Sequence, residues 1–444
     1  MPQLQQFQVN AANQGFAAVT TGPANIFKWK VEVGPVSFAS PIIGSDGTVY
    51  IGNLLAELVA VSPTGAILWK RTLDQRGSVI SASPAIDSSG NIYVVTTYHA
   101  TVRDHRSGET VTSKVANSKL HSVAPDGTLR WTFPFPVSGV DHVMGGYSLS
   151  SPKIWGQQNL IFIPALFTKI ASRVEILVID QSGNLVHRRE VADYPTPPVT
   201  SGNGVYDLLG SVWDFLNGME FEPSGGPALN KEFGWPEPSL AIADFGPHSA
   251  EPIVVIEDNW KKLAAFRWNT RQQLEPLWEK KSNDVRFRAT PSIFLSSMVA
   301  SGQHDGTLAL YDLATGQDLW KPWYKAPSPI QSPATSFISQ IYLVSLFDLS
   351  ALDANAKLIK RTSMGMMALG APGLSVDRVF VNGGDGYYSF SLDLKEVSKN
   401  NEFQGGVSSP AIAEDGSVYV IDRNKTLWAF GKETRRRPPR NPYF

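Results

Sequence analysis

Four ionisable side chains could do acid–base chemistry or bind an anion. Histidine and carboxylate groups exchange protons, and arginine binds anions through paired hydrogen bonds. The predicted catalytic set is Asp141, His142, Arg288 and His304. No spacing in the chain resembles H-E-x-x-H, a Walker loop, G-x-S-x-G or a nucleotide-binding fingerprint. Taken singly, each of the four is better explained as a turn residue, a cap or a solvated charge.

Aromatic and charged side chains near these residues form a second candidate set, for binding rather than for catalysis. Aromatic faces beside a few charged groups suit a small ligand. The predicted ligand-binding residues are His99, Tyr206, Trp213, Asp214, Trp235, Glu237, Arg286, Trp323 and Tyr324.

Composition narrows the classes of function. The 39 basic and 40 acidic residues give a net charge of −1, so nothing global attracts nucleic acid or an anionic membrane. The absence of cysteine excludes disulfides, thiolate metal sites and a cysteine nucleophile. Without a long apolar run or a signal-like start, we expect a soluble, cytoplasmic protein with no membrane span, a secreted mature form being the alternative.

An internal repeat supplies the elements that must position these residues. Three clear copies have a glycine six places and a tyrosine nine places after a proline, and they begin at Pro41, Pro84 and Pro410. Weaker copies begin at Pro152, Pro238, Pro291, Pro333 and Pro372. Strands separated by Asp-Gly or Ser-Gly turns, four in about 40 residues, are typical of a propeller blade.

The last copy lacks its fourth strand. The position equivalent to Trp69 falls at Pro438, and paired prolines cannot donate to a sheet. Residues 26–33, which include Trp29, alternate as a strand and precede the first copy. We therefore predict an all-β, eight-bladed β-propeller of four-stranded antiparallel blades, closed by this N-terminal strand. The predicted divisions are an extension at 1–24, the propeller at 25–432 and a basic, proline-rich tail at 433–444, which is either solvated or a partner contact.

Two stretches resemble the repeat of quinoprotein-type, PQQ-like propellers: "LALYDLATGQDLW" (308–320) and "LHSVAPDGTLRW" (120–131). The resemblance implies that Trp69, Trp131 and Trp320 dock neighbouring blades. The superfamily contains dehydrogenases that carry pyrroloquinoline quinone (PQQ) with calcium or a lanthanide. It also contains non-catalytic scaffolds such as the outer-membrane assembly lipoprotein.

The chain departs from the catalytic branch of that superfamily. It has no cysteine for the vicinal disulfide that commonly lies against the quinone, and the metal-ligand segments are not recognisable. Glu257, Asp258 and Asp385 stand where blade turns are expected. The resemblance therefore implies a branch that does not bind PQQ, and we expect neither PQQ nor calcium nor another metal.

Three connections are longer than the repeat requires: 96–119, 134–150 and 192–238. The first reads as a β-ribbon that turns at residues 107–108, and the last has apolar residues at helix-compatible spacing. In a four-stranded blade such connections emerge on one face, so all three are expected over blades two to four. They could wall a pocket at the mouth of the central channel, form a contact surface or only decorate the fold.

Two classes of function remain. The first is a binding or scaffold propeller that holds a small ligand or a protein partner on the decorated face. The alternative is a cofactor-independent enzyme with an acid–base pocket under the 192–238 cap, because closing lids exclude water. A quinoprotein dehydrogenase is less favoured.

Overall fold

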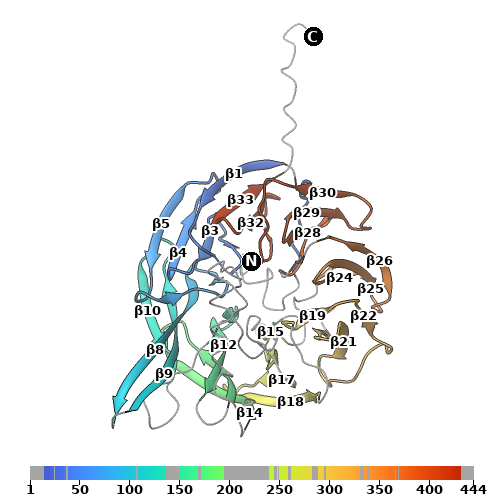
Figure 1. The fold of residues 1–444 in the computed structure, drawn as a ribbon. Helices are drawn as coiled ribbons and strands as arrows, with labels where there is room; N and C mark the ends of the chain where they lie inside the picture. The colour runs from blue at the N-terminus through green and yellow to red at the C-terminus, as the bar shows by residue number, and fades with distance from the viewer. Residues whose placement is uncertain are drawn as a thin grey trace.

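The computed structural model shows how the eight repeat copies fold: each forms one antiparallel sheet, and the sheets stand around a common axis (Figure 1). The predicted eight-bladed β-propeller is confirmed. Blades are numbered here in the chain order of their prolines. The part of the chain that the structure describes contains no helix long and apolar enough to cross a membrane.

The structure describes most of the eight blades. The described residues are 15–24, 26–36, 39–106, 109–136, 148, 150–168, 172–194, 240–244, 248, 250–258, 262–282, 289–294, 297–330, 335–337, 340–365, 367–368 and 370–431. Within them, the backbone alone is described for 99–106, 109–116, 166–168, 172–173, 192–194 and 335–337.

The first four blades follow the repeat from the axis outward. Blade 1 consists of β2 (Ile42–Ile43), β3 (Val49–Gly52), β4 (Glu57–Val61) and β5 (Ile67–Thr72). Blade 2 consists of β6 (Ser78–Val79), β7 (Ala85–Ile86), β8 (Ile92–Arg106), β9 (Glu109–Val123) and β10 (Leu129–Pro134). Blade 3 consists of β11 (Lys153–Trp155), β12 (Leu160–Thr168), β13 (Ser172–Ile179) and β14 (Leu185–Tyr194). Blade 4 consists of β15 (Leu240–Ala243), β16 (Ile253–Glu257), β17 (Lys262–Trp268) and β18 (Leu274–Lys281).

The remaining blades complete the ring. Blade 5 consists of β19 (Ser292–Phe294), β20 (Met298–Gly302), β21 (Thr307–Asp312) and β22 (Tyr324–Lys325). Blade 6 consists of β23 (Thr335–Phe337), β24 (Gln340–Ser345), β25 (Asp348–Asp353) and β26 (Leu358–Ser363). Blade 7 consists of β27 (Gly373–Leu374), β28 (Arg378–Gly383), β29 (Gly386–Ser391) and β30 (Val397–Asn400). Blade 8 consists of β31 (Ala411–Ile412), β32 (Val418–Ile421), β33 (Thr426–Phe430) and β1 (Phe27–Glu32).

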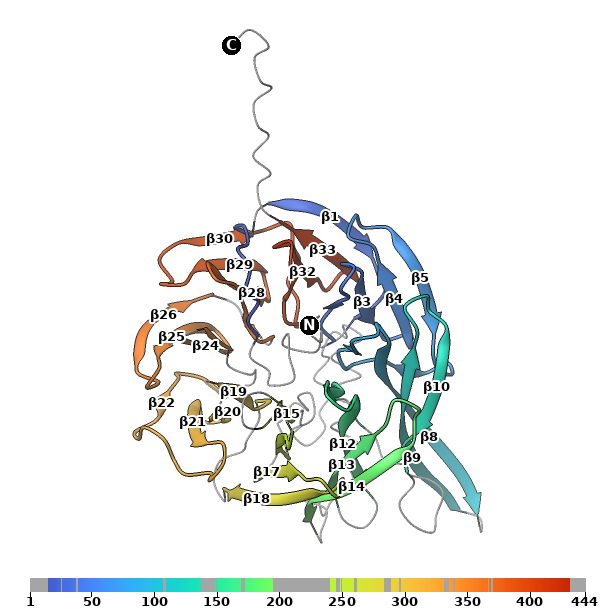
Figure 2. The ribbon, with the colours of Figure 1, turned by 180° about the vertical axis from the view of Figure 1, so that it is seen from behind.

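The two ends of the propeller close in blade 8. Strand β1 pairs antiparallel with β33, so that Trp29 lies opposite Ala429, and Figure 2 shows this join from behind. The prediction that the N-terminal strand completes the last blade is confirmed. Closure removes the open sheet edge that an unfinished last blade would leave.

The tyrosine of the repeat packs on a tryptophan two strands away. In blade 1, Tyr50 and Trp69 lie on either side of Ala60, and their rings are 5.8 Å apart. Blades 2 and 8 repeat this row with Ser122 and Ala429 in the middle. A small residue on the third strand therefore lets the two rings meet across it.

Each of these tryptophans also docks on the next blade. The indole nitrogen of Trp69 donates to the carbonyl of Pro125 over 2.9 Å, and the glycine of that turn, Gly127, has φ +86°. A Cβ at Gly127 would lie 2.9 Å from the Trp69 ring. Three further indole nitrogens donate to backbone carbonyls of the next blade: Trp29 to Pro63, Trp131 to Gln181 and Trp278 to Leu313. The docking role predicted for Trp69 and Trp131 is confirmed.

The role predicted for Trp320 is wrong. The outer strand of blade 5, β22, begins only at Tyr324, and Trp320 lies before it with φ +49° and 43% of its surface exposed. The seam between blades 4 and 5 does have its docking tryptophan, because the ring of Trp278 from blade 4 covers Gly316 of blade 5. The local match to the repeat ended in a tryptophan, but the chain leaves the blade before reaching it.

A relay of serines joins the blades close to the axis. Each of these serines precedes the proline of its repeat. The amide of Ser409 donates to Ser40 Oγ, that of Ser40 to Ser83 Oγ and that of Ser83 to Ser151 Oγ, over 2.7–3.0 Å. All four are buried. These three hydrogen bonds therefore link blades 8, 1, 2 and 3 in series.

Candidate functional site

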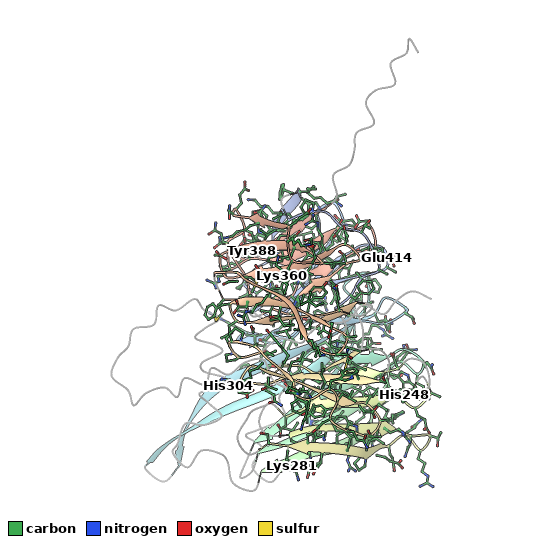
Figure 3. All side chains as sticks on the ribbon, turned by 90° about the vertical axis from the view of Figure 1, so that its right-hand side faces the viewer. His248, Lys281, His304, Lys360, Tyr388 and Glu414 are labelled. Carbon is green, nitrogen blue, oxygen red and sulfur yellow. The ribbon has the colours of Figure 1, made fainter. Side chains whose placement is uncertain are left out.

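The connections between second and third strands lie on one face of the ring. Figure 3 labels His304, between β20 and β21, on this side, and it labels His248 and Glu414 on the opposite side. Strands β8 and β9 project on the side of His304. The first extension therefore rises from the face of the connections between second and third strands, and the prediction that all three extensions share one face stays a prediction. Residues 137–147 and 195–239, most of the other two extensions, lie outside the described part of the chain.

The ribbon of blade 2 is the largest departure from the repeat that the structure describes. Strands β8 and β9 pair over 15 residues each, from Ile92 opposite Val123 to Arg106 opposite Glu109. The predicted ribbon is confirmed, while its turn at 107–108 lies outside the described residues. Strand β10 pairs only with residues 119–123, and β6 only with residues 97–98.

The distal part of the ribbon, residues 99–106 and 109–116, therefore has only two strands among the described residues. A two-stranded ribbon is marginally stable alone, and each of its edges presents unpaired N–H and C=O groups. Such an edge is a template on which a strand of another chain can pair.

The base of the ribbon is tied to the preceding blade by a chain of polar groups, of which Thr96 and His121 are buried. Thr96 donates from Oγ1 to Asp74 Oδ2 over 2.9 Å, and Lys119 donates to Asp74 Oδ1 over 2.6 Å. His121 Nε2 lies 2.8 Å from Thr96 Oγ1, and its Nδ1 lies 3.0 Å from Thr132 Oγ1. Because the single hydroxyl proton of Thr96 goes to Asp74, Nε2 of His121 must carry its own proton and Nδ1 accepts from Thr132.

Burial controls the protonation of this anchor. Only 1% of His121 is exposed, and burial lowers its pKa to about 4, with only partial compensation from the Asp74 carboxylate. Burial alone would raise the pKa of Asp74, but its hydrogen bonds, with that of Lys119 the strongest, lower it overall. At neutral pH, His121 is therefore neutral and Asp74 is ionised. The set holds the base of the ribbon.

A second anchor ties the ribbon to the following blade. Thr97 donates from Oγ1 to the carbonyl of Ser148 over 2.8 Å, and the amide of Ser148 donates to Ser118 Oγ over 2.9 Å. The hydroxyls of Thr97 and Ser118 lie 2.8 Å apart. All three residues are buried. The base of the ribbon is thus fixed on both sides.

Three of the predicted site residues have described side chains. His304 is exposed on its turn, next to Asp305, which is ion-paired with Lys325. Trp323 packs against Tyr311 and donates to the carbonyl of Leu319, and the hydroxyl of Tyr324 lies 3.0 Å from Ser350 Oγ of blade 6. The last two contribute to packing of blade 5 and to its seam with blade 6. His99 is described by its backbone alone, opposite Ala116 in the ribbon.

The other predicted site residues lie outside the described part of the chain: Asp141, His142, Tyr206, Trp213, Asp214, Trp235, Glu237, Arg286 and Arg288. Their proposed roles remain predictions.

The turn carboxylates on this face are engaged within the fold. Asp305 accepts from Lys325 and from the amide of Thr307, and Asp385 accepts from Lys399 over 2.7 Å and from the hydroxyl of Tyr388 over 2.8 Å. In both, these hydrogen bonds outweigh burial and lower the pKa. Asp258 accepts the amide of Lys262 in its turn. Within the described ranges, no three His, Asp or Glu side chains form a group that could hold a metal ion.

One buried amine differs from every other described lysine. Lys153 lies on β11, the innermost strand of blade 3, with 0% of its surface exposed. Burial lowers its pKa well below the usual value for lysine. Such an amine loses its proton more readily than an exposed one.

Sequence reasoning did not identify either anchor or Lys153. Asp74 and His121 are 47 positions apart and belong to different blades, so no short-range spacing relates them. The available signal was a run of hydroxyl residues, Thr96 and Thr97, at the point where the ribbon departs from the blade.

Comparisons with known proteins agree with this architecture. A family profile described as outer membrane protein assembly factor BamB matches residues 9–133. That range covers blade 1, the ribbon and most of the rest of blade 2. No curated protein matches the sequence.

Solved structures match over nearly the whole chain. BamB from Moraxella catarrhalis has a TM-score of 0.57 at 12% identity, over 93% of this chain and 100% of that one. Quinohemoprotein alcohol dehydrogenase from Comamonas testosteroni has a TM-score of 0.60 at 12% identity, over 96% and 80%. The computationally designed Ika8 protein has a TM-score of 0.55 at 12% identity, over 90% and 99%. Identities this low show the fold alone, and the resemblance to PQQ-like propellers is confirmed at that level.

Proposed function

We propose that this PQQ-like propeller is a non-catalytic scaffold that binds a protein partner through the face carrying the β8–β9 ribbon. One observation carries the proposal: the ribbon projects from the ring, and its distal part has no third strand among the described residues. An extended segment of a partner would pair with an open edge through main-chain hydrogen bonds.

The two anchors support this function. A flexible ribbon would lose conformational entropy each time it bound, whereas a base fixed by Asp74 on one side and Ser148 on the other holds its direction in advance. The profile that matches residues 9–133 describes an assembly factor, and those residues include the whole ribbon. The proposal requires neither PQQ nor a metal.

The test is a matched pair of full-length chains. In one, residues 101–114 are replaced by Asn-Gly, so that Ala100 and Val115 can still pair across a two-residue turn. In the other, an exposed turn away from the ribbon carries a substitution, Glu414→Gln. Quantitative affinity capture should show a protein retained by the unchanged and Glu414→Gln chains and lost with the shortened ribbon. Equal capture by all three would refute a role for the ribbon.

A second candidate, an enzyme, is favoured by Lys153. A buried amine with a lowered pKa is a common form of catalytic base or nucleophile, although structural lysines share it. Competitive acetylation of the whole protein measures both the pKa and the accessibility of each amine. If Lys153 acetylates readily at neutral pH, the enzyme is supported. If it stays unmodified while the fold persists, Lys153 has a structural role.

A further inference from the structure

The segment that precedes the first blade strand lies against the inner edge of blade 7. The amide of Ala17 donates to the carbonyl of Leu374 over 2.8 Å, and the amide of Leu374 donates to the carbonyl of Gly15 over 2.9 Å. The amide of Val376 then donates to the carbonyl of Val19 over 3.1 Å. Since β27 is the first strand of its sheet, this pairing uses the edge that faces the axis.

Side chains of the segment occupy seams on both sides of blade 7. Phe16 packs against the cluster between blades 6 and 7, and Val19 packs against the cluster between blades 7 and 8. Ala17 is buried in the latter cluster, whereas Ala18 is exposed. Residues of one short extended segment thus meet two separate apolar surfaces.

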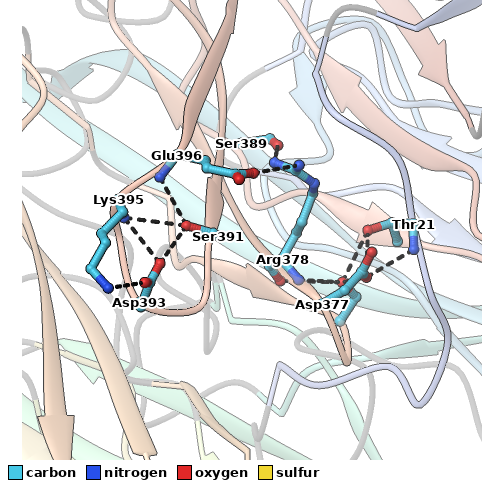
Figure 4. A network of polar contacts seen from close by, with 9 residues as sticks. Thr21, Asp377, Arg378, Ser389, Ser391, Asp393, Lys395 and Glu396 are labelled. Carbon is cyan, nitrogen blue, oxygen red and sulfur yellow. Dashed lines mark hydrogen bonds and ion pairs between the residues drawn. The ribbon is translucent and has the colours of Figure 1, made fainter.

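A polar contact fixes the end of the segment. The amide of Thr21 donates to Asp377 Oδ1 over 2.9 Å, and its hydroxyl lies 3.2 Å from the same oxygen and 3.0 Å from Ser375 Oγ (Figure 4). Ser375 is buried and itself donates to Asp377 over 2.8 Å. The carboxylate therefore receives both the main chain and the side chain of Thr21.

We infer that the inner edge of blade 7 is a binding site for an extended peptide, and that residues 15–21 are its built-in occupant. The segment pairs parallel to β27, whereas the strands within every blade pair antiparallel, so it stands outside the repeat. Its contacts have the form of a bound peptide: main-chain hydrogen bonds, side chains in apolar seams and one polar clamp. The site selects an aromatic residue, a β-branched residue three places later and a hydroxyl residue two places after that.

The occupant competes with any peptide that arrives from outside. A tethered segment acts at an effective concentration in the millimolar range, so an external peptide of equal intrinsic affinity binds weakly while the segment is seated. Releasing the segment opens the site. This inference does not depend on the ribbon, which lies on another blade.

The test uses a fluorescein-labelled peptide with the sequence of residues 13–24 and full-length chains. Phe16→Asp places a charge against an apolar seam and should release the segment, while Ala18→Asp places the same charge at an exposed position. The Phe16→Asp chain should bind the peptide at least tenfold more tightly than the Ala18→Asp chain, by fluorescence anisotropy. Adding Asp377→Ala to the Phe16→Asp chain should weaken that binding at least fivefold.

Equal affinity of the two folded chains for the peptide would overturn the inference. So would equal binding of a peptide that itself carries the Phe16→Asp change. Should Phe16→Asp prevent folding, hydrogen exchange of the unchanged chain decides. An excess of unlabelled peptide should speed exchange at the amides of Ala17 and Thr21 while Leu374 and Val376 stay protected. Exchange that is unaffected by the peptide would contradict a displaceable segment.

Discussion

The two faces of the ring are built from different kinds of connection. On one face, the turns between third and fourth strands are short. In blades 1, 2, 3 and 5 the glycine of this turn lies under a tryptophan of the preceding blade. On the other face, the connection between β8 and β9 extends into a ribbon that projects from the ring. The turns of the first face are therefore part of the packing between blades.

This difference indicates where the chain can change. A turn that forms half of a blade contact tolerates neither a longer connection nor a larger side chain. A connection anchored only at its base can lengthen without disturbing the seam. Stability should therefore depend mainly on the first face and binding on the second, and four predictions test that division.

The largest effect is expected at a docking glycine. Gly127→Ala would force a non-glycine residue to φ +86° and place its Cβ 2.9 Å from the Trp69 ring. Left-handed strain and overlap together should lower the free energy of unfolding by about 4 kcal/mol. The matched control is Gly365→Ala, at φ +75° with nothing within 4 Å of the added Cβ, where about 1 kcal/mol is expected. Equal shifts in the denaturant midpoints would show that the tryptophan contact adds nothing.

The next effect is a pH dependence from the ribbon anchor. His121 has a folded pKa of about 4 against 6.5 for the unfolded chain, so the unfolded state binds more protons between these values. Its contribution to stability is fully present above pH 6.5 and decreases as pH falls towards 4, by about 3 kcal/mol. Thermal melts of the unchanged and His121→Asn chains across pH 4–7 should differ in slope. If the melting temperatures of the two chains change in parallel with pH, protonation of His121 does not cause the loss of stability.

A smaller effect separates two tryptophans of the same region. Trp278→Ala removes an indole that donates to Leu313 and covers Gly316, and it should destabilise the fold by about 2 kcal/mol. Trp320→Ala removes a side chain that is 43% exposed, and less than about 1 kcal/mol is expected. Denaturant unfolding of both variants gives the comparison. A larger loss at Trp320 would restore the docking role that the repeat predicted.

The smallest effect is expected at the tip of the ribbon. Replacing residues 101–114 by Asn-Gly leaves both anchors in place, so stability should change by less than about 0.5 kcal/mol. Differential scanning calorimetry checks this. A large loss of stability would mean that the tip packs within the chain and is unavailable to a partner.

The fold could be predicted from the repeat because the repeated residues themselves form the contacts within and between blades. Tyr50 packs on Trp69, Gly127 lies under that tryptophan, and the serines before three of the prolines each donate a hydrogen bond to the next blade. Each has a fixed position relative to its proline, so spacing reveals it. Trp320 was misread because the same spacing held up to the residue at which the chain leaves the blade.

The candidate site was less predictable. The ribbon could be recognised from its length, but its anchors join Asp74 to Thr96 and Ser148 to Thr97, across blade boundaries. Such pairs depend on how neighbouring blades face one another, which local sequence does not encode. The seating of residues 15–21 on β27 had no signal either, because the edge it uses is more than 350 positions away.

The join between β1 and β33 also orders events in time. Trp29 and Ala429 are separated by about 400 residues, so the outer strand of blade 8 is synthesised long before the strand with which it pairs. The ring cannot close until β33 has been made. A chain interrupted between β1 and residue 426 would therefore leave β1 without its partner.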